Sequence, residues 1–350
     1  MCNRDRVSTA EPSRELTLGP ATRLLWRSPD SVHLELGSSA VVVEGLPVAL
    51  LRRVASPVPP RDAPPPTDDG ARQALIALAE AGYLWSRSTD PDDPRLTVSD
   101  PRLAGELAAL AVEHGDAAAE VLSARRHTSV EVHGTGRVAV HLASVLAAAG
   151  IGRVHCAGDG AARLSHAVPG GIAVADEGLV LAAAAEAALR RAAPDVDTTP
   201  LPVSERPDLT ILATDAPVAA ERLAALHAAD APYLAVDLRL DHGVVGPLVL
   251  PGLTGCLRCA DLHRSDRDPA WSALAVQLTV GRRHGAASAV SVATVIAGVA
   301  AQQALTFLDG GDPECIDATI ELRLPDWRLR RRSWPAHPAC GCSTGPEQPA

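Results

Sequence analysis

The chain has 350 residues, enough for two domains with at least one sizeable core. Apolar residues make up 47% of the chain and aromatic residues only 2%, so the core must be built from alanine, valine and leucine. All 32 basic residues are arginines and the net charge is −10, without a basic stripe. These features argue against a nucleic acid as the main partner, and they exclude a lysine amine from any catalytic step.

The polar residues 1–16 predict a disordered tail with no apolar core of the kind a secretory signal needs. The longest weakly polar run, 286–308, is rich in alanine and glycine and also contains serine, threonine and glutamine. It predicts a helix buried in a core or an interface rather than a membrane span. We therefore expect a cytoplasmic protein with no membrane partner. Its seven cysteines indicate metal or thiol chemistry before disulfides.

Residues 17–100 predict a small α+β unit. Short strands separated by turns occupy residues 17–46, and a proline-dense loop at 56–70 can form neither a helix nor an inner strand. A helix is predicted on each side of this loop, and residues 83–85 are expected to pair with 96–98 as a hairpin. This order is typical of a winged-helix-like unit that binds a peptide or a partner protein. A dimerisation or packing appendage is equally compatible with it.

A helix over residues 101–127 is predicted to link this unit to a second domain, which opens with a strand, a glycine turn, a helix and another strand. Gly134 and Gly136 occupy the turn, and Ala139 stands where a dinucleotide-type turn has its third glycine. Such glycines let the backbone approach a phosphate, and the helix N-terminus offers free N–H groups. Asp159 follows the second strand, where an acid can bond a ribose hydroxyl. The alternative is a tight turn that binds nothing.

The chain then continues to alternate helices with strands. A weak strand is predicted at 196–203, and a strongly apolar one at 209–214 ends at Asp215. This alternation predicts an α/β fold with a mostly parallel sheet and right-handed crossovers. Ligands of such sheets bind at the carboxyl ends of the strands, where Gly134, Asp159 and Asp215 all fall. The sequence therefore predicts a nucleotide-type cleft at this edge.

Two close cysteine pairs, far apart in the sequence, suit a tetrahedral structural zinc that clips the C-terminal tail onto the domain. The four residues are Cys256, Cys259, Cys340 and Cys342. The alternatives are a redox pair formed by the first two, free surface thiols, and His337 in place of one thiol. Cys156 and Cys315 lie in strand patterns and are interpreted as inert core residues. Residues 343–350 are predicted to be a tail.

In this order, the glycine turn, the strand that ends at Asp215 and the cysteine pairs resemble the ThiF/MoeB/E1-like family over residues 128–342. This family activates the C-terminus of ubiquitin-like proteins or peptides as an acyl adenylate. The resemblance implies a Rossmann-like domain in which Gly134 and Gly136 bind nucleotide, Asp159 holds the ribose and Asp215 holds Mg²⁺. It also implies zinc on the four cysteines, with CxC where many members have CxxC, and a homodimer.

The chain departs from the family at the phosphate contacts. Arg163 is the only arginine soon after the second strand and is out of register, and the family's lysine is missing near Leu181. Ala216 stands where the family has asparagine, and no cysteine remains for a catalytic crossover loop. The loss of one donor to a transition-state charge costs about 100-fold in rate or more. Helix spacing gives no reason to expect Arg190 or Arg191 to compensate.

The same departures resemble the E1-like partner proteins of azoline-forming cyclodehydratases, which combine a winged-helix clamp for a leader peptide with an E1-like domain that lacks ATP chemistry. We therefore expect weakened or lost adenylation and a peptide or small carrier protein as partner, with a YcaO-type cyclase as a further candidate. The alternative is an active adenylyltransferase that uses ATP and Mg²⁺. A nicotinamide or flavin oxidoreductase would leave Asp215 and the four thiols without a role.

Overall fold

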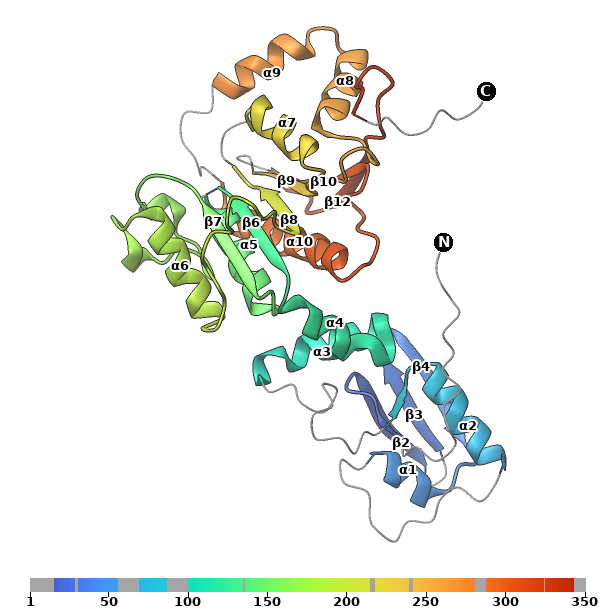
Figure 1. Ribbon diagram of the computed structural model, residues 1–350. Coiled ribbons are helices and arrows are strands. Elements are labelled where there is room, and N and C mark those ends of the chain that lie inside the picture. Colours follow the sequence, from blue (N-terminus) through green and yellow to red (C-terminus); the bar gives the residue numbers. More distant parts are fainter. Residues whose placement is uncertain are drawn as a thin grey trace. The chain divides into compact units, whose positions relative to one another are not determined.

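The computed structural model describes residues 16–28, 31–55, 69–86, 100–134, 136–214, 218–238, 242–280, 288–323 and 325–342. The chain divides into two compact units, 1–124 and 125–350 (Figure 1). The two predicted tails, 1–16 and 343–350, lie outside the described residues except for Leu16.

The first unit contains a three-stranded antiparallel sheet made of β2 (Thr22–Ser28), β3 (Ser31–Leu36) and β4 (Ser39–Glu44), in the order β2-β3-β4. Alternate residues of β3 point into the core, where Val32 and Leu34 are fully buried. This alternation is the period of two expected for a sheet that has one buried face. The short strands predicted within residues 17–46 are confirmed.

Two helices, α1 (Val48–Ala55) and α2 (Asp69–Glu80), contribute leucines to the same core. After α2, β5 (Leu84–Ser86) pairs antiparallel with β1 (Leu16–Leu18). The predicted hairpin partner of this strand, 96–98, lies outside the described residues.

The segment predicted as one linking helix, 101–127, is divided in the structure. A 3₁₀ turn leads into α3 (Ala104–His114), and a second 3₁₀ turn separates α3 from α4 (Ala118–Arg125). The break falls at Gly115, which has a φ of +54° and so leaves helical geometry. Leucines of α3 and α4 bury Trp85, so this segment up to Ala124 builds a core within the first unit.

The second unit is organised around a seven-stranded sheet with the strand order β12-β11-β10-β9-β8-β6-β7. The strands β7, β6, β8 and β9 are parallel, as the βαβ pattern predicted, and β10, β11 and β12 continue the sheet in antiparallel fashion. Their bounds are β6 (Ser129–His133), β7 (Arg153–Ala157), β8 (Leu209–Leu212), β9 (Tyr233–Leu238), β10 (His242–Val249), β11 (Ala318–Arg323) and β12 (Leu329–Ser333).

Helices cover both faces of this sheet (Figure 1). Leu234 of β9 points into the larger core with α5, α6 and α10, whereas its neighbour Tyr233 points to the opposite face with α7 and α8. This is the layered arrangement of α/β folds. The helices are α5 (Arg137–Ala148), α6 (Leu181–Ala192), α7 (Ala220–Ala228), α8 (Leu257–Arg267), α9 (Trp271–Val280) and α10 (Val290–Leu308).

The run predicted as a buried helix is α10. By length and composition it is the one helix of the described residues that could cross a membrane. Its alanines, Val292 and Ile296 are nevertheless fully buried in the larger core, where α10 packs against α5 and β10. The structure therefore places it as a core helix of the second unit.

The weak strand predicted at 196–203 is wrong. Only an isolated bridge between Arg153 and Asp197 forms there. The carboxylate of Asp197 accepts hydrogen bonds from the backbone and the hydroxyl of Thr199, at 2.9 and 2.7 Å, and it pairs with Arg153 at 2.7 Å. This local turn competes with strand pairing, and the two following prolines at 200 and 202 have no N–H groups to donate to a sheet.

A buried ion pair lies where the C-termini of α5 and α10 meet. Arg125, at the end of α4, donates to both carboxylate oxygens of Asp309 at 2.8 and 2.6 Å, and to the carbonyl of Ala149 at 2.8 Å. The two side chains are only 4% and 5% exposed. Asp309 caps the C-terminus of α10 and Ala149 caps that of α5, so this arginine ties both helix ends together.

Asp309→Ala is expected to lower the free energy of unfolding by about 3–5 kcal/mol, because it removes the carboxylate that offsets the charge of the buried Arg125 guanidinium. Denaturant unfolding of the full chain measures this change. The matched control is Glu186→Ala, which removes the exposed i,i+4 partner of Arg190 and should cost no more than about 0.5 kcal/mol. Equal effects of the two substitutions would contradict the buried character of the Arg125 pair.

Candidate functional site

The glycine turn lies between the ends of three adjacent parallel strands. Gly134 has a φ of +136°, and its N–H donates to the carbonyl of Ala157, at the end of β7, at 3.1 Å. A Cβ at this position would collide with the backbone carbonyl of Ala213, just past β8. Only glycine therefore allows this approach, and the turn is fixed at the carboxyl edge of the sheet.

Gly136 is the N-cap of α5 and offers no side-chain cap, so the first N–H groups of the helix remain available. Ala139, at the third position of the fingerprint, is fully buried where α5 packs on the sheet. A small residue is needed at such a contact between helix and strand. Free N–H groups and the positive end of the helix dipole can bind an anion here. Nucleotide binding by these residues stays a prediction.

Asp159 lies two residues beyond β7 and is exposed. Within the described part of the chain, its carboxylate makes no hydrogen bond or ion pair, so it is available to a ligand at the same edge as Gly134. Asp215 and the adjacent Ala216 lie outside the described residues, as does Thr135. The Mg²⁺ role of Asp215 therefore stays a prediction.

The arginines after β7 and on α6 have the following surroundings. Arg163 is exposed and precedes a short 3₁₀ turn. Arg190 pairs with Glu186 along α6 at 2.9 Å. Leu181, near the family's lysine position, is 2% exposed and belongs to the core. Arg190 is therefore already paired, and the buried Leu181 provides no charge.

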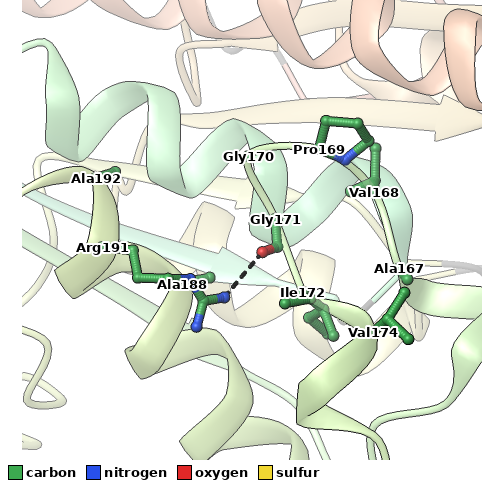
Figure 2. Close-up of a pocket in the computed structure, with 11 residues that line it drawn as sticks. Ala167, Val168, Pro169, Gly170, Gly171, Ile172, Val174, Ala188, Arg191 and Ala192 are labelled. Carbon is green, nitrogen blue, oxygen red and sulfur yellow. Dashed lines mark hydrogen bonds between the residues drawn. The ribbon is translucent and has the colours of Figure 1, made fainter.

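Arg191 lines a pocket of about 600 Å³ between the 167–174 loop and α6. Figure 2 shows its guanidinium pointing to the carbonyl of Gly171, to which it donates at 3.2 Å. The same nitrogen lies 3.0 Å from Asp176, so the charge of Arg191 is neutralised. The lining is mostly small and apolar, and it includes none of the predicted nucleotide-binding residues. This pocket is therefore not the predicted cleft.

A charged cluster that the sequence did not predict lies at the end of β6. His133 Nε2 lies 2.9 Å from a carboxylate oxygen of Glu131 and 3.0 Å from Nη1 of Arg222 in the first turn of α7. The hydrogen bond to His133 holds the pKa of Glu131 below its ordinary value. This contact stabilises the fold above the unfolded pKa of Glu131 and is lost as the pH falls through the folded value. The polar residues that alternate with Val130 and Val132 were the available signal.

Four thiols meet beside the sheet face that α7 and α8 cover. All four sulfur atoms lie within 4.8 Å of one another. The closest pairs are Cys259 with Cys342 at 3.2 Å, Cys256 with Cys340 at 3.5 Å, and Cys256 with Cys259 at 3.8 Å. Four sulfurs around a tetrahedral zinc, each about 2.3 Å from the metal, would be about 3.8 Å apart. The donor set and its geometry fit zinc, and the convergence of both pairs disfavours a separate redox pair.

Surrounding residues position these thiols. The N–H of Gly255, next to the first cysteine, donates to Asp317 at 2.6 Å, and the N–H of His337 donates to the sulfur of Cys259 at 3.3 Å. The imidazole of His337 lies 2.9 Å from Asp266, with which it pairs, so the structure favours four cysteines over a histidine ligand. Burial raises the pKa of Cys340 to about 11 without metal, so zinc binding must release protons.

A charged groove of about 570 Å³ begins beside Thr214 and runs along β9, β10 and β11 under α8 and α9. Glu321 on its floor pairs with Arg323 at 3.4 Å and with Arg332 at 3.2 Å. On its wall, the Arg264 guanidinium lies 4.5 Å from the ring centre of Trp334. One end of the groove lies at Thr214, on the same sheet edge as the glycine turn. The groove also includes Leu257 and Ala260 of α8, which are next to the cysteines in the sequence.

No protein-family model and no curated protein matches the sequence. Solved structures share its fold. E. coli MccB with ATP is 16% identical, with a TM-score of 0.67 over 93% of this chain and 99% of that one. The microcin C7 biosynthetic enzyme MccB in complex with N-formylated MccA is 16% identical, with a TM-score of 0.68 over 93% and 99%. PaaA is 17% identical, with a TM-score of 0.65 over 91% and 99%.

These likenesses show that the chain has the fold of MccB and PaaA, an α/β fold with a mostly parallel central sheet as the sequence predicted. They extend over almost the full length of both proteins, so they include the N-terminal unit. At this level of identity they establish the fold alone, and the function must be argued from the residues.

Gly134→Ala is expected to destabilise the chain more than Gly160→Ala. Both glycines have a positive φ, at +136° and +104°, but a Cβ at Gly160 meets nothing within 4 Å. The control should cost only strain, about 1–3 kcal/mol. Gly134→Ala adds a backbone collision that costs roughly a further 1–3 kcal/mol. Denaturant unfolding compares them, and equal costs would refute the close approach to Ala213.

Cys256→Ser is expected to release zinc and to lower the melting temperature by roughly 5–10 °C, since each kcal/mol shifts a unit of this size by about 2–4 °C. Metal analysis and thermal unfolding of the purified chain measure both effects. Cys315→Ala is the control, because Cys315 is buried outside the cluster and should leave the zinc in place. Wild-type protein without zinc would overturn the metal assignment.

Proposed function

We propose that this chain is an E1-like protein that binds a peptide or a small carrier protein and keeps a nucleotide at the glycine turn, with adenylation weakened. The observation that carries the proposal is the approach of Gly134 to Ala213, which holds the uncapped N-terminus of α5 at the carboxyl edge of the parallel strands. An exposed acid, Asp159, lies at the same edge, and the charged groove begins there. ATP in one solved MccB structure and N-formylated MccA in another support the same combination of ligands.

Weakened adenylation is proposed because the nearby cations are engaged or displaced. Arg190 and Arg191 pair with carboxylates, and no lysine stands near Leu181, which is itself buried. Adenylation builds negative charge on phosphate oxygens, and a site with fewer cations stabilises that transition state less. Nucleotide binding is less demanding, because helix N–H groups alone already favour phosphate.

The first unit is proposed to hold the partner as a winged-helix-like clamp. Among the described residues, β4 pairs only with β3, so its other edge is open to an additional strand. Leu25, His33 and Val42 form one row across the outer face of the sheet, with Leu25 37% and Val42 42% exposed. An extended peptide that adds to such an edge gains main-chain hydrogen bonds and side-chain contacts.

The remaining partner assignments belong to the same proposal. A YcaO-type cyclase would act on the bound peptide, and a homodimer would follow the family. Zinc on the four cysteines would hold the tail near Cys342 against α8, without taking part in the reaction. If ATP and Mg²⁺ bind, Asp159 would contact the ribose and Asp215 the metal. We place this function in the cytoplasm.

An active adenylyltransferase is the second candidate. Its support is the similarity, over 93% of this chain, to a protein described as a biosynthetic enzyme and solved with ATP. The two candidates differ in one step, the attack of a peptide carboxylate on the nucleotide, which releases pyrophosphate. Pyrophosphate exchange into ATP therefore separates them.

Calorimetric titration of the zinc-loaded protein with Mg-ATP is expected to show saturable binding that is lost in Asp215→Ala. Pyrophosphate exchange with peptides encoded beside the gene should then remain at least about 100-fold below that of an active adenylating enzyme. Robust exchange would favour the second candidate. An absence of heat from folded wild-type protein would refute the nucleotide site in both.

A further inference from the structure

Three buried polar atoms without hydrogen-bond partners belong to residues at the N-terminal ends of α5 and α10. They are Nε of Arg137, Nδ1 of His141 and Oγ of Ser288. The other end of the Arg137 guanidinium donates to the carbonyl of Ser288 at 2.6 Å, which joins the two helix starts. Buried polar atoms in native proteins are nearly always paired, so this group needs an explanation.

The position of Arg137 is electrostatically unfavourable in the absence of a ligand. It is the first residue of α5, next to the positive end of that helix's dipole, where a cation is disfavoured. No carboxylate pairs with it in the part of the chain that the structure describes. Its side chain is partly buried, so water screens the charge incompletely. An anion at this place would offset both the dipole and the unpaired charge.

Ser288 provides an independent indication of a ligand. It is only 7% exposed, yet its hydroxyl has no partner. It precedes Ala289, the N-cap of α10, which provides no side-chain cap. Two uncapped helix N-termini therefore meet around Arg137, and both offer N–H donors and positive potential. Donors without acceptors are the complement of phosphate oxygens.

His141 lies one turn after Arg137 on the same helix. Burial lowers the pKa of His141, which favours the neutral form of its ring. It can accept or donate one hydrogen bond but adds no charge. Arg137 is therefore the permanent cation of this group.

We propose that Arg137 supplies the cationic contact to the phosphate oxygens of a nucleoside triphosphate at the glycine turn, with the Ser288 hydroxyl as a further donor. This inference rests on the proposed nucleotide site and assigns its phosphate contacts. Arg137 follows Gly136 directly, so it is the arginine adjacent in sequence to the glycine turn, whereas the family's cations near Leu181 and after β7 are missing. The phosphate charge would offset that of Arg137, which pairs with no carboxylate among the described residues.

The test compares Arg137→Met with wild type, using ATP and adenosine as probes. Arg137→Met should weaken ATP binding by about 10- to 100-fold, since the loss of a hydrogen bond to a charged group raises Kd by about that factor. Adenosine, which has no phosphate, should bind both proteins equally. Without nucleotide, Arg137→Met should melt at the same temperature as wild type or higher, because it removes an uncompensated charge. ATP should stabilise it less than it stabilises wild type.

Arg163→Met is the matched control. It removes the same charge from an exposed arginine beyond β7 and should change ATP affinity by less than about twofold. Ser288→Ala is the second variant, expected to fold normally and to lose several-fold in ATP affinity. Arg137→Lys should recover part of the lost affinity through its charge.

The outcomes separate this inference from the proposed function. Wild type that binds ATP with the same affinity as Arg137→Met would overturn the role of Arg137 and leave the nucleotide site standing. Wild type that binds neither ATP nor adenosine would overturn both. A lower melting temperature for Arg137→Met with unchanged ATP affinity would show that Arg137 serves only to hold the Ser288 carbonyl.

Discussion

The approach of Gly134 to the end of β8 is the constraint on which the candidate site depends. Its N–H is bonded to Ala157 beyond one neighbouring strand, and its missing Cβ leaves room for Ala213 beyond the other. Three parallel strands therefore end around one backbone turn, and α5 starts there with no side-chain cap on its first N–H groups among the described residues. Asp159 and Thr214 come to the same edge because they follow the strands on either side. A larger residue at position 134 would separate these ends.

The antiparallel strands of the sheet line the charged groove rather than the glycine turn. The sheet continues from β9 through three strands and carries the charged groove on the face that α8 and α9 cover. The cysteine cluster lies at the start of α8 and joins it to the last described residues of the chain. Metal binding there would add stability where the apolar packing is thin, because α8 buries only Cys259 and Ala260. The groove and the cysteine cluster therefore share α8.

Local patterns were sufficient to predict much of this fold. Glycine spacing, the alternation of strands with helices and the cysteine pairs indicated the parallel strands and the cluster of four thiols. Prediction failed where tertiary or side-chain contacts decide the structure. The Asp197 turn replaced a weak strand, and Gly115 divided the expected linking helix. The polar positions beside Val130 and Val132 could single out His133, but its partner Arg222 lies 89 positions away, so no local pattern could reveal their contact. Arg137 belongs to the glycine motif in the sequence, but only the folded chain shows that its Nε has no hydrogen-bond partner.

The use of arginine alone as the cation connects these findings. A lysine can approach a phosphate as a flexible point charge, whereas a guanidinium offers several donors in a fixed plane and keeps its charge when partly buried. Arg125 uses that plane to bridge a carboxylate and a carbonyl in the core through all three of its nitrogens. Arg137 has the same chemistry with only one bond complete, at a helix N-terminus that repels it. Among the residues that the structure describes, Arg137 has no carboxylate partner beside the glycine turn, and an anionic ligand would supply one.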